Sequence, residues 1–354
     1  MGAGRRVLPT AHGDLTLPVF LPDATYGVVR AVDAADLAGA GVRAVMVNTL
    51  HLSHRPGLSV IETLGGVHRF MGWTGPVISD SGGFQVLSLS GRGGGTVSDA
   101  GLKVRAEGRA KADLLSPESA VERQFRLGSD VVICLDECTH PKAPRELQRD
   151  SVRRTLLWAR RGKEEHARQV EASAGKGRPL LVAVVQGGND PDLRRRCAEG
   201  LMELGFDGYG FGGWPLERSG KLVEAVAETA TLLPPAAPKW ALGIGGPENV
   251  VAAHAAGWQV FDCTLPTRDA RHGRLYAFRD GVGLDGDFCE RLDLTAERFA
   301  RDGGPVETGC DCATCRTLSR AYLRHLFAVG DIAAARHATI HNLRFWTRLF
   351  GRLA

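Results

Sequence analysis

Aspartates at the ends of short apolar runs are the first candidates for chemistry. Asp262 ends such a run in FDCTLPTRDARHGR, residues 261–274, directly before a loop rich in arginine. Asp80 in SDSGG and Asp136 in LDEC stand at the ends of two other runs, and Glu137 follows Asp136, where like charges would raise a carboxyl pKa. Paired carboxylates can supply a nucleophile and a general acid or base. A single aspartate after a strand is as often a helix cap or turn former, but three acids in this position favour a site.

A second cluster, CDCATC, places three cysteines, Cys310, Cys312 and Cys315, within six residues. Thiolates at this spacing are typical zinc ligands, and a tetrahedral structural site needs a fourth ligand. The following stretch reads as a helix and offers histidines at positions 325, 337 and 341, of which ATIHNLRFW favours His341. Three cysteines and one histidine leave no open position, so we expect one structural Zn²⁺ per chain. Free cysteines in a loop are the disfavoured alternative.

Eight short apolar segments, each ending in a polar residue or a glycine, predict strands that could position these residues. They begin at residues 18, 44, 76, 130, 180, 208, 239 and 258. Several gaps carry helical patterns, such as SPESAVERQFRLG, in which Ser116 and Glu118 can cap, and DLRRRCAEGLMELG, which ends in a glycine. This alternation favours an α/β fold, a (β/α)8 barrel whose active site lies at the C-terminal rim of the strands. The residues expected to meet there are Asn48, Asp80, Asp136, Gln186, Gly213, Gly243 and Asp262.

The composition excludes several classes of protein. The chain has 354 residues, of which 44% are hydrophobic and 24% charged, as in a globular protein rather than a disordered one. We expect a cytoplasmic protein with no membrane partner, since no apolar stretch could span a membrane and the N-terminus does not resemble a signal peptide. Eight cysteines, three of them clustered, do not fit a secreted disulfide framework. A net charge of +4 permits a polyanionic partner.

The sequence resembles the bacterial type of tRNA-guanine transglycosylase (queuine tRNA-ribosyltransferase) along nearly its whole length. The matching stretches, in order, include VNTLHL, LGGVHRFMGW, ISDSGGFQVLSL, LDEC, VVQGG, GYGFGG, LGIGGPENV, FDCTLPTRDARHG, CDCATC, SRAYLRHLF and TIHNLRF. The resemblance implies an irregular (β/α)8 TIM barrel at residues 1–280. A zinc-binding subdomain and a C-terminal helix packed on the barrel are expected at residues 281–354. It also implies a homodimeric pentosyltransferase of queuosine biosynthesis, which exchanges guanine at the wobble position of a tRNA anticodon for a 7-deazaguanine.

Residue roles follow from the matching positions of the family. Asp262 is the expected nucleophile, which bonds covalently to ribose C1′, and Asp80 is the expected general acid/base. The residues expected to bind the base are Ser81, Gly82, Gly83, Phe84, Asp136, Cys138, Gln186, Gly212, Gly213 and Trp214. Those expected to contact RNA are Gly243, Ile244, Gly245, Gly246, Pro247, Glu248, Asn249, Thr267, Arg268, Asp269, Ala270 and Arg271. With Arg274, the arginines would meet phosphates beside a base extruded into the pocket.

The chain departs from its relatives beside the expected pocket. WPLERSG follows Gly213 where bacterial relatives carry a small-residue loop, and Leu50 stands where a tyrosine is usual. Cys138 resembles the bacterial pattern, which favours the small 7-aminomethyl-7-deazaguanine, and the bulky Leu216 near it should disfavour queuine. The PL dipeptide after the glycines instead resembles archaeal relatives, which insert the 7-cyano base. The chain also ends earlier than typical relatives, which would weaken the hold on tRNA or the homodimer.

Two functions of other classes stay open beside base exchange. A non-catalytic RNA-binding partner subunit with this fold would have no need of Asp80 and Asp262 together. A nucleosidase or glycoside hydrolase could use both acids, but it would not need the zinc subdomain or the arginine loop.

Overall fold

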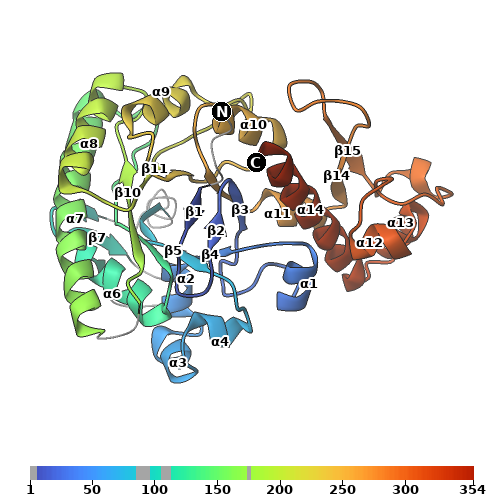
Figure 1. Ribbon diagram of the computed structural model, residues 1–354, viewed down its shortest axis with the longest axis horizontal. Coiled ribbons are helices and arrows are strands. Elements are labelled where there is room, and N and C mark those ends of the chain that lie inside the picture. Colours follow the sequence, from blue (N-terminus) through green and yellow to red (C-terminus); the bar gives the residue numbers. More distant parts are fainter. Residues whose placement is uncertain (1–5, 85–95, 105–112, 174–176) are drawn as a thin grey trace.

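The molecule is built around the predicted barrel. The computed structural model describes residues 6–84, 96–104, 113–173 and 177–354, so the QVLSL part of the motif after Phe84 lies outside the described residues. Within these ranges, eight parallel strands form a nearly closed barrel (Figure 1). In order around the barrel they are β3 (Val19–Pro22), β13 (Val260–Cys263), β12 (Lys239–Ala241), β11 (Gly208–Phe211), β10 (Leu180–Val185), β9 (Val131–Ile133), β5 (Val77–Asp80) and β4 (Val45–Asn48). Each lies inside one of the eight predicted segments, and the α/β barrel is confirmed.

Helices cover the outside of the barrel. They include α6 (Pro117–Leu127), α7 (Arg145–Ala172), α8 (Pro191–Leu204), α9 (Glu224–Leu232) and α10 (Pro247–Ala255). Ser116 caps α6 by accepting a hydrogen bond from the backbone N–H of Ser119, and Glu118, in the first turn of the helix, pairs with Arg161. Because helices cover the outer face and side chains fill the inner one, the strands are apolar on both faces.

An N-terminal hairpin plugs the end of the barrel opposite the strand C-termini. It consists of β1 (Val7–Leu8) and β2 (Leu15–Thr16), whose leucines pack against the barrel interior. In its turn, the His12 ring stacks on His68 with centroids 3.5 Å apart, and both rings hydrogen-bond to Asp130, at 2.9 and 3.0 Å. Burial alone would raise the pKa of Asp130, but these bonds hold the pKa below its ordinary value.

Shorter elements lie in the connections between the barrel strands and after the last of them. Helices α1 (Ala34–Gly39), α2 (Thr49–His54), α3 (Leu58–Thr63) and α4 (Val67–Met71) follow the first two barrel strands. A small antiparallel sheet of β6 (Thr96–Ser98), β7 (Gly101–Val104) and β8 (Asp113–Leu115) precedes α6. The C-terminal part contains α11 (Leu265–Ala270), β14 (Arg274–Phe278), β15 (Cys289–Asp293), η1 (Glu297–Phe299), α12 (Ala313–Thr317), α13 (Arg320–Ala328) and α14 (Ile332–Leu353).

The last helix, α14, packs on the barrel beside β3 and β13 and is drawn in red in Figure 1. The Phe350 ring lies against Phe20 of β3 and Phe261 of β13, with centroids 5.9 and 5.3 Å apart. The indole N–H of Trp346 donates to the carbonyl oxygen of Gly245, 3.0 Å away. The helix therefore fixes two strands and the loop after β12 relative to one another.

The C-terminal region continues from the barrel through a strand pair. The predicted boundary between residues 280 and 281 falls in the turn that joins β14 to β15, which pair with each other, and the division into two parts stays a prediction. Among the described residues, no helix combines the length and apolar character needed to cross a membrane.

Candidate active site and metal centre

A cavity of about 1120 Å³ opens at the C-terminal ends of the barrel strands, where the predicted site residues were expected to meet. The predicted residues that line it are Asn48, Asp80, Ser81, Gly82, Gly83, Phe84, Asp136, Cys138, Gln186, Gly212, Gly213, Trp214, Gly243, Gly245, Gly246, Glu248, Asn249, Asp262 and Arg268. Seven residues predicted to contact RNA lie outside the lining, namely the exposed Arg271 and Arg274 and the buried Ile244, Pro247, Thr267, Asp269 and Ala270. All of the residues predicted to bind the base therefore line one cavity, whereas only some of the residues predicted to contact RNA do so.

Asp262 and Asp80 line the cavity from β13 and β5, and each is held by donors. The backbone N–H of Gly243 donates to Asp262 at 3.3 Å. The side-chain amide of Asn48 and the backbone N–H of Thr49 donate to Asp80, at 2.7 and 3.1 Å. Burial and the Asp80 charge raise the pKa of Asp262 to about 7, in spite of the bond from Gly243. Asp262 therefore changes its charge near neutral pH.

A third carboxyl group, which was not predicted as a site residue, lies between these two on the rim. Asp23 follows β3, the strand between β13 and β4, and lines the same cavity. Burial and the charges of Asp262 and Asp80 raise the pKa of Asp23 well above its ordinary value. The signal was present in the sequence, because Asp23 ends the run PVFLPD just as Asp80 ends its own run.

Asp136 and Gln186, at the ends of β9 and β10, form a hydrogen-bonded pair in the cavity wall. The side-chain amide of Gln186 donates to Asp136 at 2.5 Å. Burial raises the pKa of Asp136 to about 6. The negative charge of Glu137 acts in the same direction, but its effect is smaller than that of burial. Glu137 is directed to α7, where it forms a two-bond ion pair with Arg154. Of the two acids in the LDEC motif, Asp136 therefore lines the cavity, and Glu137 pairs with a residue of the helices outside the barrel.

A buried arginine that the sequence did not single out fixes the backbone behind this wall. Arg194 of α8 donates to the carbonyl oxygens of Val185, Gly188 and Gly212, at 2.9, 2.8 and 2.9 Å. Its guanidinium group also lies 4.1 Å from the centre of the Phe211 ring. Because a guanidinium has five donors, one side chain can hold the loops after β10 and β11 together. The run of three arginines in this helix gave no sign of which one is buried.

The loop that departs from the family forms part of the cavity rim. Trp214 and Leu216 line the cavity, and a bridge between Leu216 and Leu222 folds the loop back on itself. The Trp214 and Phe84 side chains are each 44% exposed, and their ring centroids are 5.7 Å apart. The two aromatic rings therefore stand together at the mouth, where both line the cavity and both are partly exposed.

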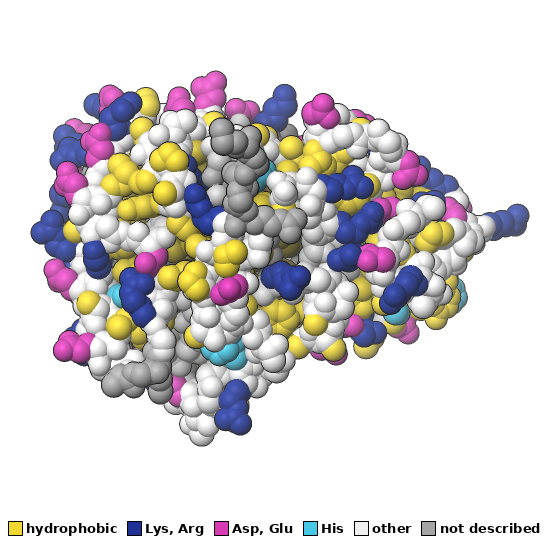
Figure 2. Space-filling model, viewed as in Figure 1, with side chains coloured by type: hydrophobic (Ala, Val, Ile, Leu, Met, Phe, Trp, Pro, Cys, Tyr) yellow, Lys and Arg dark blue, Asp and Glu magenta, His cyan; other side chains and the backbone are white. Residues whose placement is uncertain are grey.

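The arginine-rich loop after Asp262 is organised by a buried acid. Asp269 accepts a hydrogen bond from the Tyr276 hydroxyl, and its carboxylate lies 3.8 Å from nitrogen atoms of both Arg268 and Arg274. These two arginines are more than half exposed. Figure 2 shows Lys and Arg side chains gathered over the region where Figure 1 places β14 and α14. The loop can therefore present positive charge to a polyanion beside the cavity.

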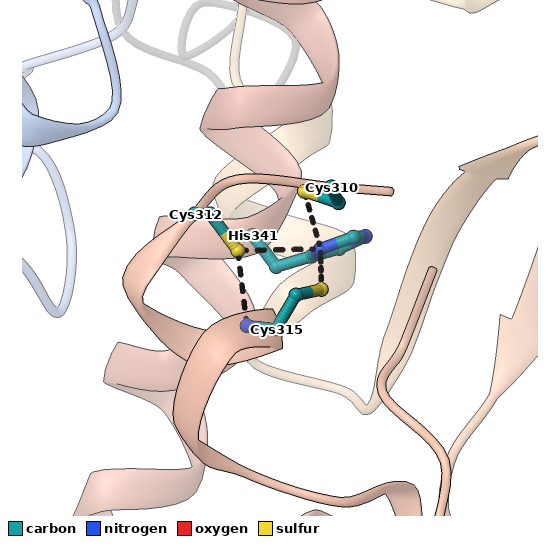
Figure 3. Close-up of side chains that lie close together, drawn as sticks. All are labelled: Cys310, Cys312, Cys315 and His341. Atoms are coloured by element: carbon teal, nitrogen blue, oxygen red, sulfur yellow. Dashed lines mark hydrogen bonds between the residues drawn. The ribbon is translucent and has the colours of Figure 1, made fainter. Parts of the chain in front are cut away.

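The Cys310, Cys312, Cys315 and His341 side chains converge as predicted, and Figure 3 shows them pointing toward one another. The three sulfur atoms lie 3.8, 3.7 and 3.2 Å from His341 Nδ1, in chain order. The other ring nitrogen, Nε2, lies 2.7 Å from the carbonyl oxygen of Tyr276. A proton on Nε2 leaves Nδ1 free for a metal, so the donor set fits a closed, four-coordinate metal site.

The family model described as queuine tRNA-ribosyltransferase matches residues 2–353. Curated proteins named queuine tRNA-ribosyltransferase are similar over almost the whole chain. That of Solidesulfovibrio magneticus is 39% identical over 98% of this chain and 88% of its own length. That of Thiobacillus denitrificans is 40% identical over 99% and 91%, and that of Koribacter versatilis is 40% identical over 97% and 88%. The chain belongs to the queuine tRNA-ribosyltransferase family.

Membership in the queuine tRNA-ribosyltransferase family confirms the resemblance seen in the motifs and the prediction of a transferase of the pentosyl class. The late group of three cysteines and one histidine is confirmed as a group that could hold a metal ion. The individual residue roles stay predictions.

The first prediction concerns the group of three cysteines and one histidine, which we expect to bind one metal ion and to stabilise the fold. Cys312→Ser should reduce bound metal from about one ion per chain to well under half and lower the melting temperature, because a closed site contributes folding energy. Elemental analysis by mass spectrometry and thermal unfolding measure both effects. Cys289→Ser, at a cysteine outside the group, should keep its metal. Full metal content in Cys312→Ser would contradict the assignment.

Proposed function

We propose that the chain exchanges guanine in a tRNA anticodon for a 7-deazaguanine through a covalent bond between ribose C1′ and Asp262. The observation that carries the proposal is the meeting of Asp262 and Asp80 in one cavity of a chain about 40% identical to queuine tRNA-ribosyltransferases. Base exchange without chain cleavage needs a nucleophile for C1′ and a group that carries a proton.

In the proposed reaction, a carboxylate oxygen of Asp262 attacks C1′ as the glycosidic bond breaks. The electron pair of that bond goes to the departing guanine, which takes a proton from Asp80. The incoming base then gives a proton to Asp80, attacks C1′ and releases Asp262. Two displacements preserve the configuration at C1′, as in retaining glycosidases, and each passes through a transition state with positive charge on the ribose.

Asp136 and Gln186 are suited to read the edge of a guanine-type base. A carboxylate accepts from the ring N–H and the amino group, and an amide N–H donates to the ring carbonyl. Gln186 uses one amide proton for Asp136 and has a second one to donate. The Phe84 ring at the mouth is available to stack on the base. Arg268, Arg271 and Arg274 would hold phosphates on either side of the extruded nucleotide.

The rim favours a small base, of which 7-aminomethyl-7-deazaguanine is our choice. Trp214 and Leu216 line the cavity, and the bulk of these two side chains would disfavour the cyclopentenediol of queuine. Among the described residues, none donates a hydrogen bond to the carbonyl oxygen of Trp214, so this oxygen is available to an ammonium group. The 7-cyano base is the runner-up, because a nitrile needs little from its surroundings when it is buried.

We further propose that the metal is zinc. A set of three thiolates and one imidazole is typical of closed zinc sites, and these residues lie on the C-terminal elements rather than in the cavity. The ion would therefore hold α12 to α14 and take no part in the exchange itself. In elemental analysis, zinc should account for nearly all of the bound metal.

The second prediction tests the two acids. Asp262→Asn should lower the rate of labelled guanine incorporation into tRNA by at least about 1000-fold, because the nucleophile is lost. Asp80→Asn should also be strongly impaired, since an amide does not carry the proton. Asp14→Asn, at an exposed acid in the N-terminal hairpin, should behave as the unmodified protein. An RNA-binding subunit without activity of its own would show no incorporation in any of the four proteins, and a hydrolase would release guanine without incorporating it.

The third prediction concerns pH. Only the carboxylate form of Asp262 can attack, so kcat/KM for guanine exchange should rise with pH up to the pKa of this group, about 7. The measurement is a pH series from roughly 5.5 to 8.5 at constant ionic strength, with tRNA folding checked at each pH. A kcat/KM value that does not rise between roughly pH 5.5 and 7 would contradict the assignment.

The fourth prediction concerns base choice. In competition kinetics, the aminomethyl base should be used first, the cyano base second, and queuine at least about tenfold more slowly than either. Trp214→Ala should narrow the gap for queuine by opening the rim. Efficient insertion of queuine by the unmodified protein would show that Trp214 and Leu216 do not restrict the pocket.

A further inference from the structure

The carboxyl group of Asp23 is placed by the strand register at the centre of the reactive rim. Asp262 pairs with Leu21 across β13 and β3, so these two side chains point to the same, inner face of the barrel. Asp23 is two residues beyond Leu21 and therefore shares that face, one step nearer the mouth. The rim thus carries Asp262, Asp23 and, beyond β4, Asp80.

The carboxyl group of Asp23 has no hydrogen-bond donor among the described residues, unlike the neighbouring carboxyl groups of Asp80 and Asp262. Within the described ranges, no hydrogen bond or ion pair reaches it, whereas Asn48 and Thr49 donate to Asp80 and Gly243 donates to Asp262. A polar group that faces an open cavity without a protein partner is left to bond to water or to a ligand, because leaving it unmet lowers stability. The chain therefore presents an unused acceptor beside the residue proposed to attack ribose.

Chemistry at C1′ specifies which part of the ligand comes within reach. The 2′-hydroxyl is on the carbon next to the one that Asp262 would attack, so it lies beside the nucleophile during both displacements. In retaining glycosidases, hydrogen bonds to the hydroxyl next to the reacting carbon strengthen as positive charge develops on the sugar. A carboxyl oxygen accepts such a bond whether or not the group carries its proton.

We propose that a carboxyl oxygen of Asp23 accepts a hydrogen bond from the 2′-hydroxyl of the nucleotide whose base is exchanged. The proposal rests on the proposed function and deepens it by naming the group that makes the exchange depend on ribose. The 2′-hydroxyl is also the feature by which a protein distinguishes RNA from DNA. Asp23 then acts on substrate selection and on the transition state, while Asp262 and Asp80 keep their own roles.

The test is a double-mutant cycle with one substitution in the protein and one in the RNA. An anticodon stem-loop with 2′-deoxyguanosine at the exchanged position is compared with the all-ribose stem-loop. For the unmodified protein, the 2′-deoxy substrate should lower kcat/KM by roughly 10- to 100-fold, mainly through kcat. For Asp23→Ala, the same change in the RNA should lower kcat/KM by less than about threefold, because the partner is already gone.

Two controls separate this contact from a structural effect. Asp33→Asn, at an exposed acid on the segment after β3, should keep the full 2′-deoxy penalty. A deoxyribose at the neighbouring nucleotide should affect the unmodified protein and Asp23→Ala equally. Asp23→Asn is close to isosteric and keeps an acceptor oxygen, so it should retain a penalty between those of the other two proteins even if the alanine variant is unstable.

The outcomes distinguish this inference from the proposed function. Exchange on the all-ribose stem-loop with equal 2′-deoxy penalties in the unmodified protein, Asp23→Asn and Asp23→Ala would overturn the role of Asp23 and leave base exchange intact. A negligible penalty in the unmodified protein would overturn it as well. Absence of exchange on every substrate would refute the proposed function, and the role of Asp23 with it.

Discussion

Mutual repulsion among three carboxyl groups at one mouth is the constraint to which the rest of the site responds. The parallel register of β3, β5 and β13 holds Asp23, Asp80 and Asp262 on the inner rim of the barrel. Burial and these charges raise the pKa values of Asp23 and Asp262, so assembling the rim opposes folding when all three are charged. The same arrangement favours a substrate that becomes positive, which is what the ribose does in a displacement at C1′.

The metal centre and the cavity are linked through α14 and β14. His341 of α14 faces the metal group with Nδ1 and contacts the carbonyl oxygen of Tyr276 with Nε2. Tyr276 lines the cavity, and its hydroxyl donates to Asp269, the acid beside Arg268. A closed site with no free coordination position can therefore support the exchange by positioning, because it fixes the elements from which the arginine loop and one cavity wall are built.

Much of this architecture was predictable because the signals are local. Eight apolar runs marked the barrel strands, and Cys310, Cys312 and Cys315 marked the metal group. Other features depend on which strands become neighbours. The position of Asp23 beside Asp262 depends on the pairing of β3 with β13, and the burial of Arg194 depends on carbonyl groups from the end of β10 and from the two loops after β10 and β11. A motif also gives no sign of burial, which is why several residues expected to contact RNA lie inside the protein. The homodimer stays a prediction.

The most direct measurement of the central claim is the site of the covalent bond to RNA. The protein is incubated with an anticodon stem-loop without added free base, denatured to stop turnover, digested with a protease and a nuclease, and analysed by mass spectrometry. The account predicts a ribosyl fragment on the peptide that contains Asp262, with fragmentation placing the added mass on that residue. A fragment attached to Asp80 or Asp23, or catalytically active protein from which no covalent RNA species can be trapped, would contradict it.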